Sequence, residues 1–531
     1  DSAGRQSATV GPDPDGAGDL KPTRVERVYD DLGRVTSVKT YKDDTTDVLL
    51  ARTDTAYGAA GVTSVKTYKI NGTPPAAGDS LETVYSYDGM GRRVKATQPS
   101  GAFSKTVYTA WGRVTGSYLG TAEGNTTDAD NVTDDTIVEQ SVPTYDYAGR
   151  VIQTTAYQRT DSSGKTGDLS SSWAASDSRR TFSCTWFDGL GRASHAADYG
   201  DNGGADLSRP ATAPEPNTSD TVLVVKYEYD GYGRNHKVTD NKGRVAMTFF
   251  DSYGRRTHVA ENYDNFNASN DAGTGDGSDA SKDRVTKFVY LGPTSLLSEQ
   301  VALDADGDGN LSDNQGTRYV WQAELSAGGC AVPDGTRLRA IIYPDSDDTV
   351  AGQALSDGGD TNYDRVELTY LADGNTHTRK DQRGSIRTFG YDDLGRLTSD
   401  AVTTAGTGVD TAVLRIERSY DDFDRAFKVT SYDAASGGSV VNEVSYAYNG
   451  VGQVEAECQE HRGAADSDTL CVRYGYDDTA AGGVLTKGMR LKSVRYPSVG
   501  ANQYARTAGE VAARLHHLTY GAADGVDDRL S

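Results

Sequence analysis

The acidic run at residues 304–313, DADGDGNLSD, has the residue types and spacing that best suit a metal ion in this chain. Aspartates at alternate positions followed by glycine form the first half of a calcium loop. Three carboxylates there converge on one hard cation while glycine permits the sharp bend. The sequence therefore predicts a Ca²⁺ site, and Ca²⁺ is the cofactor that we expect. The predicted ligands are Asp304, Asp306, Asp308, Asn310, Ser312 and Asp313.

Two features set this run apart from a paired helix–loop–helix calcium site. Gln315 stands at the twelfth position, where a bidentate glutamate completes the usual loop, and no helical pattern flanks the run. The alternative is an acidic turn that faces solvent. A looser acidic group is a weaker second candidate for the cation. Its members are Asp271, Asp276, Asp279 and Asp283.

Catalytic chemistry has no comparable signal in the sequence. There is no G-x-S-x-G, no H-E-x-x-H and no Cys/His set at zinc spacing. Gly231-Tyr232-Gly233 begins like a dinucleotide-binding loop, but the third glycine is absent and a strand pattern follows it. We therefore predict a protein that is not an enzyme.

A six-residue signature, Tyr/Phe-Asp-x-x-Gly-Arg, recurs along the chain and fixes the architecture that positions everything else. Its unbroken copies occupy residues 29–34, 87–92, 145–150, 187–192, 229–234, 250–255 and 391–396. Degenerate copies occupy 108–113, 420–425 and 448–453.

Each signature predicts the turn of a β-hairpin. Before the copy at 229–234, apolar and charged residues alternate with the period of two that a half-buried strand shows. Aspartate favours the first position of a type I turn, and the glycine three residues later can take positive φ to close a hairpin with a bulge. We expect the arginine to be structural, lying across the preceding tyrosine ring or pairing with a neighbouring repeat's aspartate.

These copies resemble the YD repeat of the RHS family, which includes bacterial RHS proteins, toxin-complex relatives and teneurins. The resemblance implies hairpins laid edge to edge in a spiralling sheet, a shell that can enclose a C-terminal toxin. The D-P-x-G-L-type motif linked to autoproteolysis in many members is absent here. The fold class expected is therefore all-β, one continuous array over residues 1–531 that belongs to a larger protein, with an insertion at 298–360 carrying the calcium-type loop.

The charge and composition of the chain disfavour some classes of binding partner. The net charge of −23 disfavours nucleic acid and anionic lipid, and no apolar run reaches the length of a membrane span. Cys458 and Cys471 could face each other across a hairpin mouth, and a disulfide there would favour export. Buried free thiols are as plausible for Cys184 and Cys330, whose pairing the spacing leaves open.

The function expected is that of an exported structural wall or scaffold, extracellular or at the cell surface. Its expected partners are other segments or copies of the same protein. Two alternatives remain: a cage that encloses a C-terminal effector, and an adhesin whose tyrosines stack on carbohydrate. Whether the sheet closes as a cage, tube or filament depends on its curvature, which the sequence leaves open. The best helical pattern, Glu510–Leu518, is short.

Overall fold

The chain folds as a succession of β-strands. The computed structural model describes residues 4–14, 21–43, 48–68, 80–124, 129–160, 165–170, 178–271, 282–303, 314–322, 335–344, 365–450, 452–467, 469–476, 491–497 and 515–517. They include one short 3-10 helix, η1 (Asn202–Gly204). The strands are β1 (Ala8–Val10), β2 (Thr23–Tyr29), β3 (Val35–Lys42), β4 (Leu49–Tyr57), β5 (Val62–Tyr68), β6 (Ser80–Tyr87), β7 (Arg93–Thr97), β8 (Phe103–Tyr108), β9 (Val114–Ala122), β10 (Thr136–Tyr145), β11 (Val151–Arg159), β12 (Ser178–Phe187), β13 (Ala193–Asp198), β14 (Leu223–Tyr229), β15 (Asn235–Thr239), β16 (Val245–Phe250), β17 (Arg256–Glu261), β18 (Arg284–Tyr290), β19 (Leu297–Leu303), β20 (Gln315–Trp321), β21 (Leu338–Ile342), β22 (Arg365–Tyr370), β23 (Thr376–Lys380), β24 (Ile386–Tyr391), β25 (Leu397–Thr404), β26 (Arg415–Tyr420), β27 (Ala426–Tyr432), β28 (Val440–Tyr448), β29 (Val454–Glu460), β30 (Cys471–Tyr476), β31 (Leu491–Arg495) and β32 (Leu515–His517).

All 32 described strands belong to one sheet in which each strand pairs antiparallel with its neighbours in sequence. An isolated hairpin is marginal in water, and its free edges invite pairing. Continuing the ladder from hairpin to hairpin satisfies those edges, so the all-β prediction of consecutive hairpins is confirmed.

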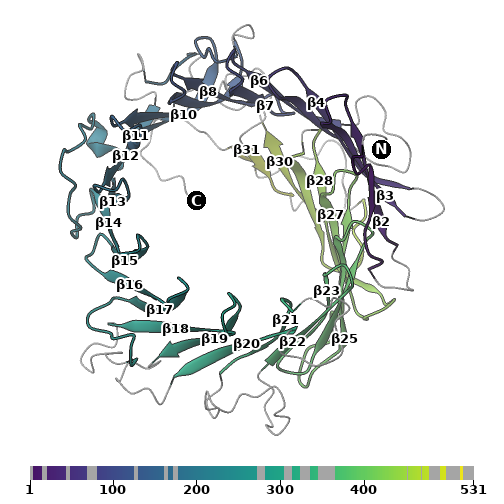
Figure 1. The fold of residues 1–531 in the computed structure, drawn as a ribbon. Helices are drawn as coiled ribbons and strands as arrows, with labels where there is room; N and C mark the ends of the chain where they lie inside the picture. Colours follow the sequence, from purple (N-terminus) through teal and green to yellow (C-terminus); the bar gives the residue numbers. More distant parts are fainter. Residues whose placement is uncertain are drawn as a thin grey trace.

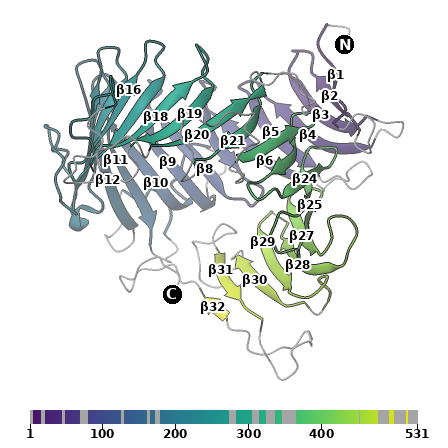
Figure 2. The same ribbon diagram turned by 90° about the horizontal axis from the view of Figure 1, so that it is seen from below.

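The sheet curves into a ring around a central space (Figure 1). Strands β1 to about β23 complete the ring, and β25–β31 continue below it as the start of a second turn (Figure 2). The strip is therefore a spiral. Its curvature is the feature that the sequence left open.

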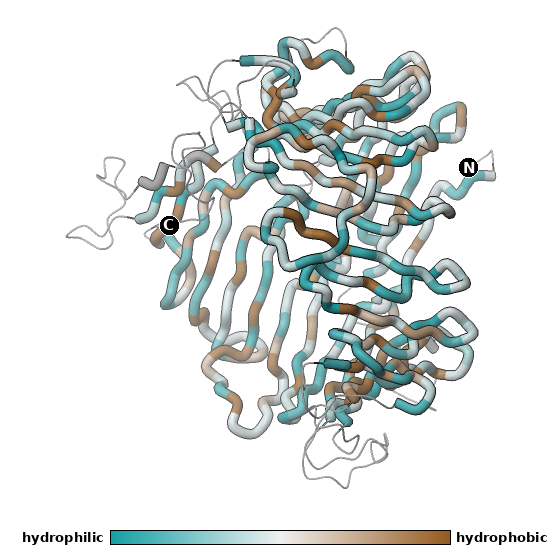
Figure 3. The backbone as a smooth tube through the Cα atoms, turned by 90° about the vertical axis from the view of Figure 1, so that its left-hand side faces the viewer, coloured by the Kyte–Doolittle hydropathy of each residue, from teal (hydrophilic) through white to brown (hydrophobic). Residues whose placement is uncertain are grey.

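Apolar residues are interspersed with polar ones along the strands instead of forming one central core (Figure 3). Small hydrophobic clusters form where long connections fold back over the sheet. In one, Phe182, Trp186 and Val224 pack with Leu207 of the loop that follows β13. That loop lies outside the ring in Figure 1. Stability is thus distributed along the wall in local units, as expected for a repeat protein.

The strand pairing bears on two expectations from the sequence, the insertion at 298–360 and the helical pattern at Glu510–Leu518. Within residues 298–360, the described part forms β20 and β21 and most of β19, and these strands pair in sequence like the others. The short helix expected at Glu510–Leu518 is wrong for its described part, because Leu515–His517 is β32, paired with β31. Pairing with an open sheet edge overrides a weak local helical preference there.

Candidate functional site

The predicted calcium loop, residues 304–313, lies outside the described residues, so the site stays a prediction. It connects two strands that pair with each other, and Gln315 already belongs to the ladder, opposite Ala302. Within the part of the chain that the structure describes, no group of three His, Cys, Asp or Glu side chains is arranged to hold a metal ion.

The looser acidic group has other partners where it is described. Asp283 is buried and its carboxylate accepts the backbone N–H groups of Asp264 and Asn265. The Asp271 carboxylate contacts the His258 ring at 3.0 Å and the Lys287 ammonium at 2.6 Å. These two aspartates therefore hold local structure. Positions 276 and 279 are outside the described residues.

The turn at 230–234 shows how the signature builds a hairpin. Asp230 Oδ1 accepts the backbone N–H groups of Tyr232 and Arg234, each at 2.9 Å, and Asp230 Oδ2 accepts Arg234 Nε at 2.7 Å. Gly233 has φ of 83° and donates its N–H to the Asp230 carbonyl at 3.0 Å. The pairing shifts register between Glu228 and Tyr229, which is the expected bulge.

The same turn recurs at every unbroken copy, where the turn glycine has φ between 75° and 85°. The degenerate copies form the same turn, although other residues replace the aspartate, glycine or arginine of the signature. Asp424 stands at the glycine position with φ of 64°. Asn449 replaces the aspartate and pairs its amide with Gln453, the residue at the arginine position. The hairpin prediction is therefore confirmed at the level of individual hydrogen bonds.

The repeat arginine is structural, but its expected partners need correction. Its guanidinium pairs with the aspartate of its own turn and lies over the aromatic ring of a following hairpin, not over the tyrosine that opens its own signature. The other expected contact is made at one copy, where Arg396 also pairs with Asp424 of the next hairpin. Arg192 contacts Asp188 and lies 4.2 Å from the Tyr229 ring centroid, while the Tyr229 hydroxyl donates to the Ala193 carbonyl at 2.8 Å. Where the turn has its aspartate, the carboxylate fixes the guanidinium in orientation, and the stacked pair links consecutive hairpins.

These hydrogen bonds lower the pKa values of the turn carboxylates. Backbone N–H donation by Arg34, with its guanidinium, holds the pKa of Asp30 below its ordinary value, and Arg92 does the same for the pKa of Asp88. The pKa values of the corresponding aspartates at 146 and 188 are lowered for the same reason.

Acid should therefore destabilise the wall. A carboxyl whose pKa is lower in the folded than in the unfolded chain stabilises the fold above its unfolded pKa of about 3.9, and this stability is lost as pH falls through the folded pKa. We expect the Tm to hold down to about pH 5 and to fall steeply below about pH 4 as several turns are protonated together. A Tm that stays level through this acid range would contradict the role given to the turn carboxylates.

Two turns of the spiral touch through residues that are far apart in sequence. Lys42 Nζ lies 3.1 Å from Asp393 Oδ2, and the Lys21 backbone N–H donates to Asp393 Oδ1 at 3.3 Å. Ala372 N–H donates to the Pro14 carbonyl at 3.3 Å. We call these the closing contacts. Sequence reasoning missed them, because Asp393 occupies a variable turn position and its partners have no local signature.

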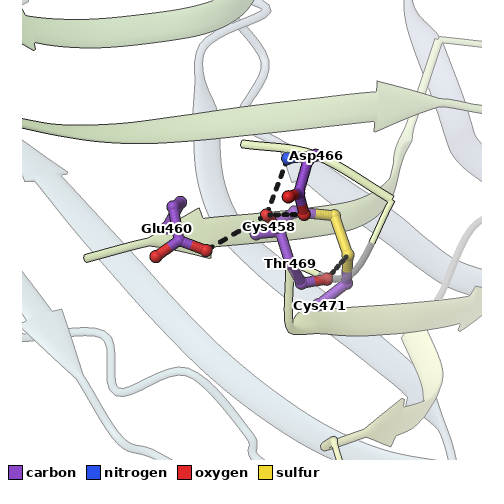
Figure 4. Close-up of a disulfide and its surroundings, with 5 residues drawn as sticks. All are labelled: Cys458, Glu460, Asp466, Thr469 and Cys471. Atoms are coloured by element: carbon purple, nitrogen blue, oxygen red, sulfur yellow. Dashed lines mark hydrogen bonds between the residues drawn. A yellow bond between two sulfur atoms is a disulfide. The ribbon is translucent and has the colours of Figure 1, made fainter. Parts of the chain in front are cut away.

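A disulfide joins Cys458 and Cys471, which stand directly opposite each other on β29 and β30 with Cα atoms 3.9 Å apart (Figure 4). Next to it, the Thr469 side chain accepts the Asp466 N–H at 2.9 Å and contacts Glu460. The sequence left this pairing open. Cys184 is a buried free thiol, and Cys330 lies outside the described residues.

A shallow cavity of about 620 Å³ opens on β9–β12. Leu119, Glu139, Gln158 and Arg179 share one face there, because the register places them opposite one another on successive strands. The lining contains no histidine, cysteine or lysine. This surface offers polar contacts to a ligand or a polypeptide.

The fold and its turn define the class: an all-β wall of consecutive hairpins with the YD-repeat signature at the bends, in agreement with the expected resemblance to RHS-type repeats. No family model and no curated protein matches the chain. Solved structures of low identity do match. One is "Crystal Structure of TcdB2-TccC3-Cdc42", with a TM-score of 0.47 and 15% identity over 92% of this chain and 24% of the solved chain.

A second is the TcdB2-TccC3 crystal structure, with a TM-score of 0.45 and 15% identity over 92% of this chain and 24% of that one. The structure of the Photorhabdus luminescens Tc holotoxin pore matches with a TM-score of 0.39 and 14% identity over 91% of this chain and 24% of the solved chain. This chain spans about a quarter of the length of these solved chains. The likeness is one of fold.

Proposed function

We propose that this chain is the wall of a β-shell that encloses a polypeptide cargo and has no enzymatic role of its own. The observation that carries the proposal is the closed curvature. The sheet returns on itself after one turn, and the closing contacts hold the second turn against the first. A flat or gently bent scaffold has no need of such contacts.

The architecture supports enclosure over the open wall or filament that we expected first. Among the described strands, ladder pairing leaves no free edge within a turn, so the wall is continuous around the central space (Figure 1). A polypeptide inside it is separated from solvent proteases by the full thickness of the sheet. One solved structure of similar fold is described as a Tc holotoxin pore, which makes a toxic effector the cargo to test first.

The test is protease protection of a cargo. An unfolded, protease-sensitive reporter fused after Ser531 is expected to be digested more slowly than the same reporter free in solution, and imaging should show a hollow particle. Asp393→Lys, which places like charges at the Lys42 contact, should speed digestion. Combining it with Lys42→Asp restores opposite charges and should slow digestion again.

Other outcomes separate the rival functions. Digestion at the rate of the free reporter in all three proteins rules out enclosure. Long filaments in the images favour a scaffold that assembles from copies of the chain, and specific binding to glycans favours the adhesin.

We also propose that Ca²⁺ binds the loop at 304–313. A ligand that binds only the folded state stabilises it by about 2.7 kcal/mol at a hundred times its dissociation constant. Calcium should therefore raise the Tm of the parent protein, and Asp306→Ala combined with Asp308→Ala should abolish that increase. Both proteins should melt alike in chelator. A parent melting curve that is unchanged by chelator refutes the site.

An extracellular or cell-surface location is the remaining proposal. The disulfide at Cys458–Cys471 supports it, because disulfides persist in oxidising compartments. Among the described residues, no helix is long and apolar enough to cross a membrane. Thiol alkylation of the protein in its native compartment is the test. Ready labelling of Cys458 and Cys471 without a reductant would contradict it.

A further inference from the structure

A lysine and an aspartate meet inside the wall where solvent does not reach them. Lys105, on β8, has its Nζ 2.8 Å from Oδ2 of Asp135, the residue that precedes β10, and both side chains are fully buried. Glu123 Oε1 lies 3.2 Å from the same Nζ, and the Phe103 ring centroid lies 5.1 Å from it. An amine and a carboxyl group are thus held together away from solvent, with a second carboxylate beside them.

Two details make this arrangement unlike an ordinary ion pair. In the part of the chain that the structure describes, Asp135 Oδ2 has no hydrogen-bond donor at normal angles, although the Lys105 ammonium is within 2.8 Å. The other oxygen, Oδ1, accepts the Gly124 N–H at 3.0 Å. Gly124 packs so closely that a Cβ there would lie 2.1 Å from the Asp134 carbonyl oxygen. Glycine is therefore what allows this N–H to reach the carboxyl group.

A second buried carboxylate in the same protein provides the contrast. Glu443 is also buried and has Lys428 Nζ at 3.0 Å, but the Lys428 side chain is 37% exposed. The Thr430 hydroxyl and the Ala465 N–H donate to the two Glu443 oxygens, at 2.8 and 3.1 Å. In that pair the Lys428 amine is in contact with solvent, and both Glu443 oxygens accept hydrogen bonds, as in a structural ion pair. Among the ion pairs of the described residues, no second carboxylate lies at the Lys428 amine.

We propose that Lys105 and Asp135 condense into an intramolecular isopeptide bond, with Glu123 carrying the proton. The Lys105 Nζ–Asp135 Cγ bond forms and the Cγ–Oδ2 bond breaks. An ammonium and a carboxylate become an amide and one water molecule. Two protons of the ammonium leave on Oδ2, so charge and atoms balance without an oxidant or cofactor.

Each neighbour has a part in this reaction. Glu123 takes a proton from Nζ to free the lone pair that attacks, and returns it to the departing Oδ2. Burial raises the pKa of Glu123, but hydrogen bonds from Lys95 and Lys105 outweigh burial and keep it below its ordinary value, so this group is a base at neutral pH. The Gly124 N–H points at the oxygen that becomes negative in the tetrahedral intermediate. Nζ also donates to the Asn131 carbonyl at 2.8 Å, which holds the amine in place.

The bond would join β8 covalently to the connection between β9 and β10. Residues 129–135 of that connection lie against the sheet through Val132, and their main chain is anchored by Gly167 N–H donation to the Asp135 carbonyl at 2.8 Å. A covalent link across about thirty residues removes loop entropy from the unfolded chain, as a disulfide of similar span does. It would do so in reducing and oxidising conditions alike.

Intact mass spectrometry of the reduced protein is the deciding experiment. The expected mass is that of the sequence less one water molecule, and digestion should give a branched peptide that joins Lys105 to Asp135. Glu123→Gln should fold and keep the full mass, as should Asp135→Asn combined with Glu123→Gln. The Lys428 and Glu443 peptides, the matched control, should remain separate.

Either of two results overturns the proposal. One is a folded parent protein with the full sequence mass. The other is a mass lower by one water whose branched peptide maps elsewhere. The parent measurement decides the matter even if a variant fails to fold, and complete linkage in Glu123→Gln would remove Glu123 from the mechanism.

Discussion

Replacing Gly233 with valine is expected to open the β14–β15 hairpin. The backbone at Gly233 has φ of 83°, a region that a β-branched residue enters only as a strained outlier. Holding a non-glycine residue there costs about 1–3 kcal/mol. Because β13 and β16 still pair with the hairpin, the loss should be local. Amide exchange in β14 and β15 should therefore rise about 5- to 150-fold, with a smaller fall in the global Tm.

Gly231 in the same turn is the matched control. Its φ is not positive and a Cβ there would meet nothing within 4 Å, whereas a Cβ at Gly233 makes an ordinary 3.6 Å contact with Arg192. Gly231→Val adds the same side chain without the forbidden φ, so it should leave amide exchange near the parent value. Equal effects of the two substitutions would show that side-chain bulk, not backbone conformation, limits the turn.

The turn was predictable because its causes lie within six residues. The Asp230 carboxylate accepts hydrogen bonds from the backbone N–H groups two and four residues later, and Gly233 has the one positive φ of the turn. The spacing of aspartate and glycine in the sequence is therefore enough to predict the turn geometry. The disulfide was half predictable for a related reason. Sequence places Cys458 and Cys471 on either side of a connection, but only the register puts them directly opposite each other.

What the sequence could not give depends on how hairpins follow one another. The arginine's ring lies in the next repeat because the register between hairpins, not the turn, places Tyr229 beside Arg192. The closing contacts at Asp393 require the summed curvature of more than twenty strands. Lys105 and Asp135 meet because a long connection folds back over the sheet, and neither belongs to a motif that marks it.

The second large effect is expected from Asp421, whose side chain is 22% exposed. Its carboxylate accepts the N–H groups of Phe423 and Arg425 at 2.9 and 3.0 Å and pairs with the Arg425 guanidinium. Asp421→Ala leaves these donors without their acceptor and frees the guanidinium that lies over the Tyr448 ring. The expected loss is about 1–3 kcal/mol in the free energy of unfolding, measured by denaturant titration.

The next hairpin shows how the loss can be recovered. At Asn449 the amide oxygen accepts the Gln453 N–H at 3.0 Å, and the amide nitrogen donates to Gln453 Oε1 at 2.8 Å. In Asp421→Asn alone, the amide NH₂ group of the new asparagine would face the N–H donors of the Arg425 guanidinium, and two donors cannot form a hydrogen bond with each other. Adding Arg425→Gln supplies an acceptor and copies the neighbouring turn, so the double variant should be more stable than Asp421→Asn alone. A double-mutant cycle measures this coupling. If the double variant is no more stable than that single variant, the turn depends on the charge of its aspartate and not on the matching of donors to acceptors.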